Sequence, residues 1–311
     1  MKRILITGGA GFIGTNLCKE LVKNKTNYIY CLDNFYTGKM KNISELLNCP
    51  NFELIEDDIT DLHFDNPVDE IYNLACPASP PAYQEFPIKT FETSVFGINN
   101  LIKLAIKYNA KILQASTSEI YGNPLTHPQD ESYWGNVNPI GVRSCYDEGK
   151  RGAECLLSDY HRNGLKAIIV RIFNTYGPYM DKNDGRVISN FINQALCNKP
   201  ITIYGQGTQT RSFCFVKDLV NGLIKAMDIA EFGPINLGNP IELNMIQLAE
   251  KILRLTDSKS EIIFQNLPED DPCKRKPDIR KASEILEWHP IIGIDEGLSM
   301  TIDYYRRNLC V

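Results

Sequence analysis

The chain has 311 residues, of which 43% are hydrophobic and 23% are charged, and its formal net charge is −5. This length and composition are typical of a globular protein with one large domain or two closely packed domains. The negative balance argues against a general nucleic-acid or anionic-membrane surface, so any phosphate recognition must come from local arginines.

The first predicted element is a strand at Arg3–Thr7, which runs through a glycine-rich turn into a helix at Phe12–Lys23. The turn carries glycines at three-residue intervals, Gly8, Gly11 and Gly14. Glycines let the backbone turn tightly and approach a pyrophosphate, and a helix N-terminus offers free N–H groups to phosphate oxygens. The pattern predicts a dinucleotide-binding turn.

The next predicted strand, Tyr28–Asp33, indicates which dinucleotide is bound. Asp33 lies 19 positions past Gly14. A carboxylate there accepts a hydrogen bond from the ribose 2′-hydroxyl of NAD and would repel the 2′-phosphate of NADP. Residues 34–37 include no arginine that would reverse this preference, so we expect NAD as the cofactor.

Strand and helix patterns alternate through the first half of the chain. Strands are predicted at Arg3–Thr7, Tyr28–Asp33, Phe52–Glu56, Glu70–Leu74, Lys111–Ser116 and Ala167–Phe173. Helices are predicted at Phe12–Lys23, Ile88–Tyr108 and Tyr146–Asn163. Repeated βαβ units with nearly continuous apolar strands predict an α/β fold with a doubly wound parallel (Rossmann) sheet, in which ligands bind beyond the carboxyl ends of the strands.

The second half of the chain has shorter segments and loops rich in glycine, proline and charge. Helices are predicted there at Val187–Cys197, Asp218–Ile229, Leu243–Leu255 and Asp295–Arg307. We expect a smaller, mostly helical C-terminal cap that binds the substrate. The expected division is an NAD-binding domain at 1–173, to which segments near 212–240 return, and a discontinuous cap at 174–311.

The candidate catalytic pair is Tyr146 and Lys150, four residues apart at the start of a predicted helix. This spacing places their Cβ atoms about 5–6 Å apart on one helical face. A nearby ammonium favours the tyrosinate and is expected to lower the phenol pKa from its usual value of about 10. Tyr146 would then take the proton of a hydroxyl whose carbon loses hydride to a nicotinamide.

These features, together with the Ser/Thr residues that end the preceding strand, resemble the extended short-chain dehydrogenase/reductase superfamily. The chain is similar to its nucleotide-sugar branch from end to end, and above all to the UDP-glucuronate decarboxylases (UDP-xylose synthases). The stretches that carry this similarity are residues 75–83, 115–122, 133–141, 145–151, 172–178, 184–187, 204–211 and 271–278. Two positions depart from the pattern: Ser94, where relatives usually carry asparagine thought to bend the helix near the active site, and Cys76, where they often carry serine.

The resemblance implies a role for each of several residues. The implied catalytic residues are Thr117, Glu119, Tyr146, Lys150 and Arg275. The implied NAD-binding residues are Gly8, Gly11, Phe12, Ile13, Asp33, Asn34, Thr37, Asp58, Leu74, Lys150 and Phe173. The implied substrate-binding residues are Pro81, Tyr83, Asn174, Arg186, Val187, Tyr204, Gln209, Arg211 and Arg275. Guanidinium groups suit the phosphates of a UDP-sugar and an aromatic side chain suits its base.

Members of this branch begin by oxidising C4 of the sugar, and the residues beside Thr117 should decide the fate of the resulting ketone. A C4 ketone is β to a C5 carboxylate, so loss of CO₂ gives an enolate that the hydroxyls of Thr117 and Tyr146 can stabilise. Protonation at C5 and return of the hydride would then give UDP-xylose. The role of Glu119 stays open: it could orient a water, act as an acid with a raised pKa, or help to drive out CO₂.

Three alternatives compete with decarboxylation. A 4,6-dehydratase carries Thr-Asp-Glu where this chain has Thr117-Ser-Glu119, and an aspartate beside the substrate carboxylate would cost up to about 4 kcal/mol. Glu119 argues against a 4-epimerase, and the intact Tyr146–Lys150 pair argues against an inactive NAD-binding sensor or scaffold. We expect an NAD-dependent UDP-glucuronate decarboxylase, a carboxy-lyase.

Location and assembly are expected from simpler features. The ten cysteines include no C-x-x-C pair and no zinc-like spacing, so we expect reduced thiols and no metal. With no signal segment and no apolar run long enough for a bilayer, we expect a cytoplasmic protein without a membrane or nucleic-acid partner. The helices at 88–108 and 146–163 carry apolar residues on more than one face, which predicts a homodimer through a four-helix bundle.

Overall fold

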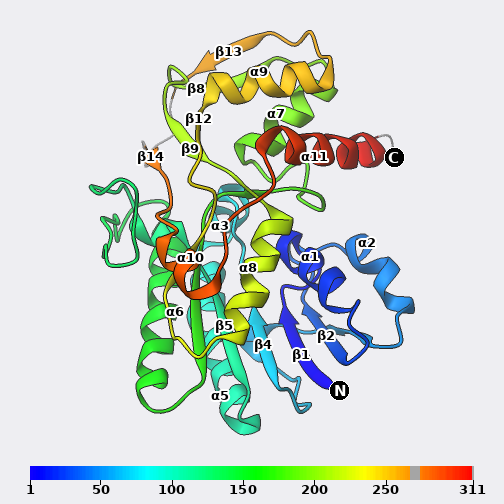
Figure 1. The fold of residues 1–311 in the computed structure, drawn as a ribbon, viewed down its shortest axis with the longest axis vertical. Helices are drawn as coiled ribbons and strands as arrows, with labels where there is room; N and C mark the ends of the chain where they lie inside the picture. The colour runs from blue at the N-terminus through cyan, green and yellow to red at the C-terminus, as the bar shows by residue number, and fades with distance from the viewer. Residues whose placement is uncertain (267–273, 310–311) are drawn as a thin grey trace.

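The computed structural model describes residues 1–266 and 274–309, and a seven-stranded parallel sheet forms its larger unit (Figure 1). Across the sheet the strands lie in the order β11-β6-β5-β4-β1-β2-β3. Their bounds are Lys2–Thr7 (β1), Asn27–Asp33 (β2), Phe52–Glu56 (β3), Glu70–Asn73 (β4), Lys111–Thr117 (β5), Ala167–Ile172 (β6) and Ile235–Leu237 (β11). Six of these strands confirm the predicted ones within two residues, and β11 was not predicted.

The strand order reverses at β1, which pairs with β2 on one side and with β4 on the other. The connections that follow β1 and β4 run to opposite faces of the sheet, which opens a crevice at the carboxyl ends of these two strands. Thr7, Leu32 and Asn73 lie side by side at this edge. The topology therefore places the expected dinucleotide turn at the position where doubly wound sheets bind ligands.

Helices cover both faces of the sheet. One face is covered by α1 (Phe12–Leu21), α8 (Val216–Asp228) and α10 (Arg280–Leu286), which bury apolar side chains against β1 and β6. The other face is covered by α5 (Ile98–Tyr108) and α6 (Ser144–Arg162), which do the same. These apolar faces repeat at the helical period, which is why most of these helices could be predicted.

The predicted helix at 88–108 is wrong as one continuous element. The structure has α4 (Pro87–Glu92), one π-helical turn (Thr93–Gly97) and then α5. Ser94 lies in the π turn, where its Oγ is 3.2 Å from Cys76 Sγ, so the two departures from the family pattern contact each other. The π turn is therefore present here with serine at position 94. One inserted residue hardly changes the hydrophobic period, so the sequence pattern did not predict it.

The second unit lies above the sheet in Figure 1 and is built around α7 (Val187–Leu196), α9 (Met245–Thr256) and α11 (Ile294–Leu309). Its core is apolar and includes Phe191, Leu248 and Ile302. It also contains short strands: β8 (Ile201–Tyr204), β9 (Thr210–Ser212), β12 (Glu242–Asn244), β13 (Ile262–Gln265) and β14 (Lys274–Arg275). The cap therefore contains strands as well as helices, whereas a mostly helical cap was expected. The sequence did not indicate these strands, because segments of two to four residues rarely show a clear hydrophobic pattern.

The remaining elements are short segments of six residues or fewer. They are α2 (Met40–Ile43), η1 (Ser44–Asn48), η2 (Ile59–Asp61), α3 (Pro80–Glu85), η4 (Ser118–Tyr121), β7 (Thr175–Tyr176) and β10 (Cys214–Phe215). In the part of the chain that the structure describes, no helix is both long and apolar enough to span a bilayer.

Candidate active site

A cavity of about 1090 Å³ lies between the carboxyl edge of the sheet and the cap. Its walls come from the β1–α1 turn, the ends of β2, β4, β5 and β6, helix α6 and the cap segments around α7 and β9. Every residue that the sequence analysis assigned to catalysis, NAD or substrate lines this cavity. The structure therefore brings together side chains that are up to 267 positions apart, from Gly8 to Arg275.

The glycine-rich turn forms one end of the cavity. Gly8 has a φ of +67°, and a Cβ at this position would lie 2.8 Å from the carbonyl oxygen of Leu74. A Cβ at Gly14 would lie 2.1 Å from the carbonyl oxygen of Gly8, so α1 can pack this closely only with glycine. Among the described residues no side chain caps the N-terminus of α1, which leaves its first N–H groups available to phosphate oxygens.

Asp33 ends β2 beside this turn and is 6% exposed. Its carboxylate accepts hydrogen bonds from the backbone N–H groups of Ala10 (2.9 Å) and Phe35 (2.8 Å). Burial raises the pKa of Asp33, and these backbone donors oppose the shift. A carboxylate has about four lone-pair sites, so capacity remains for the hydroxyls of a ribose. These residues fit NAD.

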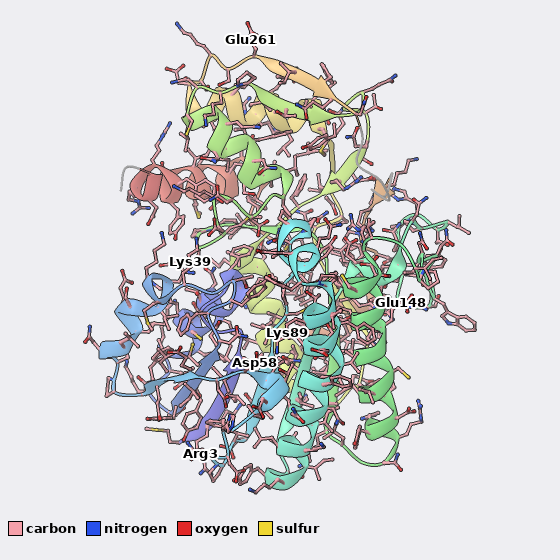
Figure 2. The ribbon with its side chains drawn as sticks, turned by 180° about the vertical axis from the view of Figure 1, so that it is seen from behind. Arg3, Lys39, Asp58, Lys89, Glu148 and Glu261 are labelled. Atoms are coloured by element: carbon pink, nitrogen blue, oxygen red, sulfur yellow. The ribbon has the colours of Figure 1, made fainter. Side chains whose placement is uncertain are left out.

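Asp58 joins two loops at the same end of the cavity. Its carboxylate accepts a hydrogen bond from Asn34 Nδ2 (3.0 Å) and lies 3.0 Å from Lys89 Nζ, a pair that is labelled in Figure 2. Burial works to raise the pKa of Asp58, but hydrogen bonds from Thr60, Lys89 and Asn34 lower it to about 2. Asp58 is therefore ionised at neutral pH and fixes the loop after β2.

Tyr146 and Lys150 lie on one face of α6, as their spacing predicts. Lys150 Nζ is 5.8 Å from the Tyr146 ring centroid and donates a hydrogen bond to the carbonyl oxygen of Ala115 (2.9 Å). Burial raises the pKa of Tyr146, and the side chain of Thr117 partly opposes this shift. The expectation that the phenol pKa of Tyr146 is lowered is therefore wrong, because desolvation raises it.

Glu119 lies between two guanidinium groups. Its Oε2 is 2.5 Å from Arg143 Nη2, and its Oε1 is 3.0 Å from Arg275 Nη1. Burial works to raise the pKa of Glu119, but the charges of Arg275 and Arg143 outweigh it and the pKa is lowered. Glu119 is thus a carboxylate at neutral pH, which contradicts the option of an acid with a raised pKa.

Arg275 is 2% exposed and also donates to Ser118 Oγ (3.1 Å) and to the carbonyl oxygen of Gly122 (2.9 Å). It therefore holds the Thr117-Ser118-Glu119 segment in place from the far end of the chain. The motif at 271–278 that pointed to Arg275 extends outside the described residues at positions 271–273.

Arg143 is a site residue that the sequence reasoning missed. It lies three positions before Tyr146, at the N-cap of α6. The signal that could have found it is electrostatic, because a buried carboxylate such as Glu119 needs a compensating cation.

Several of the predicted substrate residues belong to cap segments that line the cavity. Arg186 forms a two-bonded ion pair with Asp184 (2.5 and 2.8 Å), and Val187 is the first residue of α7. Tyr204 ends β8 and is 42% exposed, and its carbonyl oxygen accepts a hydrogen bond from Gln209 Nε2 (2.6 Å). The arrangement offers arginines and an uncapped helix N-terminus to an anionic, nucleotide-like ligand. Across residues 1–266 and 274–309, no group of three or more His, Cys, Asp or Glu side chains could hold a metal ion.

Comparison with known proteins gives the family. Residues 4–238 match the model of the "NAD dependent epimerase/dehydratase family". The chain is 53% identical to UDP-glucuronic acid decarboxylase 6 of Arabidopsis thaliana over 99% of its own length and 90% of that protein. It is 50% identical to UDP-glucuronic acid decarboxylase 1 of Xenopus tropicalis over 99% of its length and 73% of that protein.

Solved structures share the same fold. One is a UDP-glucuronic acid 4-epimerase from Bacillus cereus in complex with UDP-glucuronic acid and NAD, with a TM-score of 0.89, 28% identity, and 98% and 99% of the two chains covered. Another is a UDP-glucose 4-epimerase from Thermotoga maritima with UDP-glucose, with a TM-score of 0.91, 28% identity and 99% of both chains covered. With an NAD-type turn, a Tyr-x-x-x-Lys helix and these relatives, the chain belongs to the NAD dependent epimerase/dehydratase family.

Proposed function

We propose that this protein converts UDP-glucuronate into UDP-xylose and CO₂, using an NAD that is returned to its oxidised form in every cycle. The relatives that share about half of its residues over nearly the whole chain are UDP-glucuronic acid decarboxylases. The observation that carries the proposal is the cluster beside Tyr146, in which Arg143 and Arg275 flank Glu119 and the neighbouring Ser118 is neutral. This cluster suits a sugar that carries a carboxylate.

Bound NAD would supply the hydride acceptor, held by the glycine turn, Asp33 and Lys150. Thr117 and Tyr146 would hold the C4 hydroxyl, and Tyr146 would take its proton as C4 is oxidised. Burial raises the pKa of Tyr146, so this step needs the positive charges of Lys150 and of the bound nicotinamide, which favour the tyrosinate. Their hydroxyls then stabilise the enolate that CO₂ loss leaves, as oxyanion-hole donors do. Tyr146 finally returns the same proton to O4 when C4 is reduced again.

Two neighbouring reactions are disfavoured by the same cluster. A dehydratase would need an acid at position 118. Ser118 is not an acid; its hydroxyl is buried and accepts a hydrogen bond from Arg275. The two epimerases named above are each 28% identical to this chain, against 53% for the decarboxylase of Arabidopsis thaliana. Decarboxylation is therefore the function that the site supports best.

We expect the purified protein to carry NAD and to turn over UDP-glucuronate without added cofactor. The reason is that the hydride leaves and returns within one cycle, so none is consumed. The measurement is product NMR with UDP-glucuronate alone, which should show UDP-xylose and released CO₂. Consumption of one NAD per sugar, with accumulation of a C4 ketone, would instead identify a net dehydrogenase.

We also propose a homodimer, held by the face on which α4, the π turn and α6 lie side by side (Figure 2). Three large apolar side chains on this face are exposed: Ile88 (75%), Phe91 (40%) and Phe96 (55%). Such a cluster on helices that already pack against each other suits a second copy of the same pair, which would form a four-helix bundle.

In sedimentation experiments we expect the mass of two 35.2 kDa chains. Phe96→Glu should produce monomers, because it would place a charge in the apolar interface. Ile241→Glu, at an exposed apolar side chain (68%) outside these helices, should leave the dimer intact. A wild-type mass of one chain would contradict the proposal.

Two further proposals concern location and domain division. A cytoplasmic location is supported by the eight cysteines of the described residues, all of which are free thiols, as in a reducing compartment. The division into an NAD-binding domain and a discontinuous substrate cap is supported by β11 and α8, which return from the second half of the chain to the sheet.

A further inference from the structure

The proposed reaction needs a proton that the residues assigned above do not supply. The substrate loses its carboxylate as CO₂, and C5 takes up one proton in its place, so each turnover consumes one proton. Tyr146 cannot be the net source, because it returns to O4 the proton that it took from O4. Glu119 cannot be the source, because Arg143 and Arg275 lower its pKa and hold it ionised.

Asp147 is the carboxyl group of this cluster that has no assigned role. It follows Tyr146 in α6 and is 6% exposed. Its Oδ1 is buried and has no hydrogen-bond partner among the described residues. Buried polar atoms are nearly always satisfied, so an orphaned carboxyl oxygen beside a catalytic tyrosine requires an explanation.

Tyr83 also has a buried polar atom without a hydrogen-bond partner among the described residues. Its side chain is 1% exposed, and its hydroxyl also has no partner within the described part of the chain. Its ring stacks on the ring of Tyr146, with centroids 5.1 Å apart and an interplanar angle of 6°. Tyr83 lines the cavity, and the charge of Asp147 acts on its hydroxyl. A buried donor without an acceptor, on the ring stacked against Tyr146, and a buried acceptor without a donor, on the residue that follows Tyr146, therefore flank the same catalytic tyrosine.

We propose that Asp147 holds the proton that C5 takes up, and that the hydroxyl of Tyr83 passes it on. In this step the O–H bond of Tyr83 breaks as the C5–H bond forms from the enolate electrons. The Asp147 proton moves to the Tyr83 oxygen at the same time, directly or through one water molecule, so that no tyrosinate forms. Asp147 is left as a carboxylate and regains its proton from solvent. This inference rests on the proposed decarboxylation.

The charges around Asp147 agree with this role. Burial and the charge of Glu119 raise its pKa, Arg143 and Arg275 oppose them, Glu148 adds to the rise, and the pKa reaches about 7. Tyr83 of α3 and Cys145 of α6 also interact electrostatically with Asp147, and burial raises the pKa of both groups. Asp147 is therefore protonated below about pH 7 and ionised above it, whereas Tyr83 stays neutral throughout.

The test compares Asp147→Asn and Tyr83→Phe with the control Glu148→Gln, which changes the same charge one residue along α6 (Figure 2). Wild-type kcat should decline above about pH 7 as Asp147 loses its proton. Asp147→Asn should lower kcat by about 10²-fold and abolish this decline. Glu148→Gln should keep the wild-type kcat. The decline should move slightly to lower pH, because the charge of Glu148 no longer raises the pKa of Asp147.

A single-turnover experiment shows whether the slowed step is CO₂ release or the later protonation of C5. In Asp147→Asn and Tyr83→Phe, CO₂ should leave at nearly the wild-type rate, but UDP-xylose should form slowly, with the nicotinamide reduced in the meantime. A merely structural role would slow CO₂ release equally or lose bound NAD, and either result would overturn the proposal. So would an unchanged kcat and pH profile. Tyr83→Phe tests it independently if Asp147→Asn does not fold. If the wild-type protein releases no CO₂ from UDP-glucuronate, the proposed function itself is wrong.

Discussion

Replacing Tyr146 with phenylalanine should lower kcat for UDP-glucuronate by about 10²–10⁴-fold while the protein still purifies with NAD. The substitution keeps the ring that stacks on Tyr83 and removes only the hydroxyl that exchanges a proton with O4. Because that hydroxyl acts both in oxidation and in the return of the hydride, its loss affects the first chemical step and the last. The measurements are steady-state turnover and the nicotinamide content of the purified variant.

Tyr160→Phe is the matched control for this substitution. Tyr160 lies on the same helix, and its hydroxyl is at the limit of hydrogen-bond distance (3.5 Å) from Asn99 Oδ1, away from the cavity. It should leave turnover close to the wild-type value. A Tyr146→Phe variant with near wild-type turnover would place the proton transfer on another residue.

The second large effect is expected for Ser118→Asp, which would lower kcat/KM for UDP-glucuronate by roughly ten- to a thousandfold. The introduced carboxylate would lie near the substrate carboxylate, where repulsion costs up to about 4 kcal/mol. The structure adds a second cause. Ser118 Oγ is 3.1 Å from Arg275 Nη1, so a carboxylate there would compete with Glu119 for this guanidinium.

Ser118→Asn separates charge from size, because asparagine has nearly the same shape as aspartate without its charge. We expect it to lose less activity than Ser118→Asp. Competitive inhibition by UDP should be nearly unchanged in both variants, because UDP carries no sugar carboxylate. Equal losses for UDP and UDP-glucuronate would indicate a distorted site, and unchanged turnover would mean that Ser118 does not face the carboxylate.

The sequence alone determined those features that depend on neighbouring residues. The strand, glycine turn and helix at the N-terminus, with Asp33 at the end of β2, follow from local backbone and side-chain requirements. The same holds for Tyr146 and Lys150, whose spacing of four places them on one face of any helix. Nearly continuous apolar runs located six of the seven sheet strands, because strands covered on both faces by helices bury most of their side chains.

Only the tertiary structure decided the chemistry around Glu119. Arg143 and Arg275 lie 24 and 156 positions from it, and no local pattern relates residues at such separations. The sign of each pKa shift was also undecided, since it depends on the balance between desolvation and nearby charge. Two guanidiniums lower the pKa of Glu119, whereas burial raises the pKa values of Tyr146 and Asp147. Burial is a property of the packed chain, so the sequence pattern alone does not tell how deeply a given carboxyl or phenol group is buried.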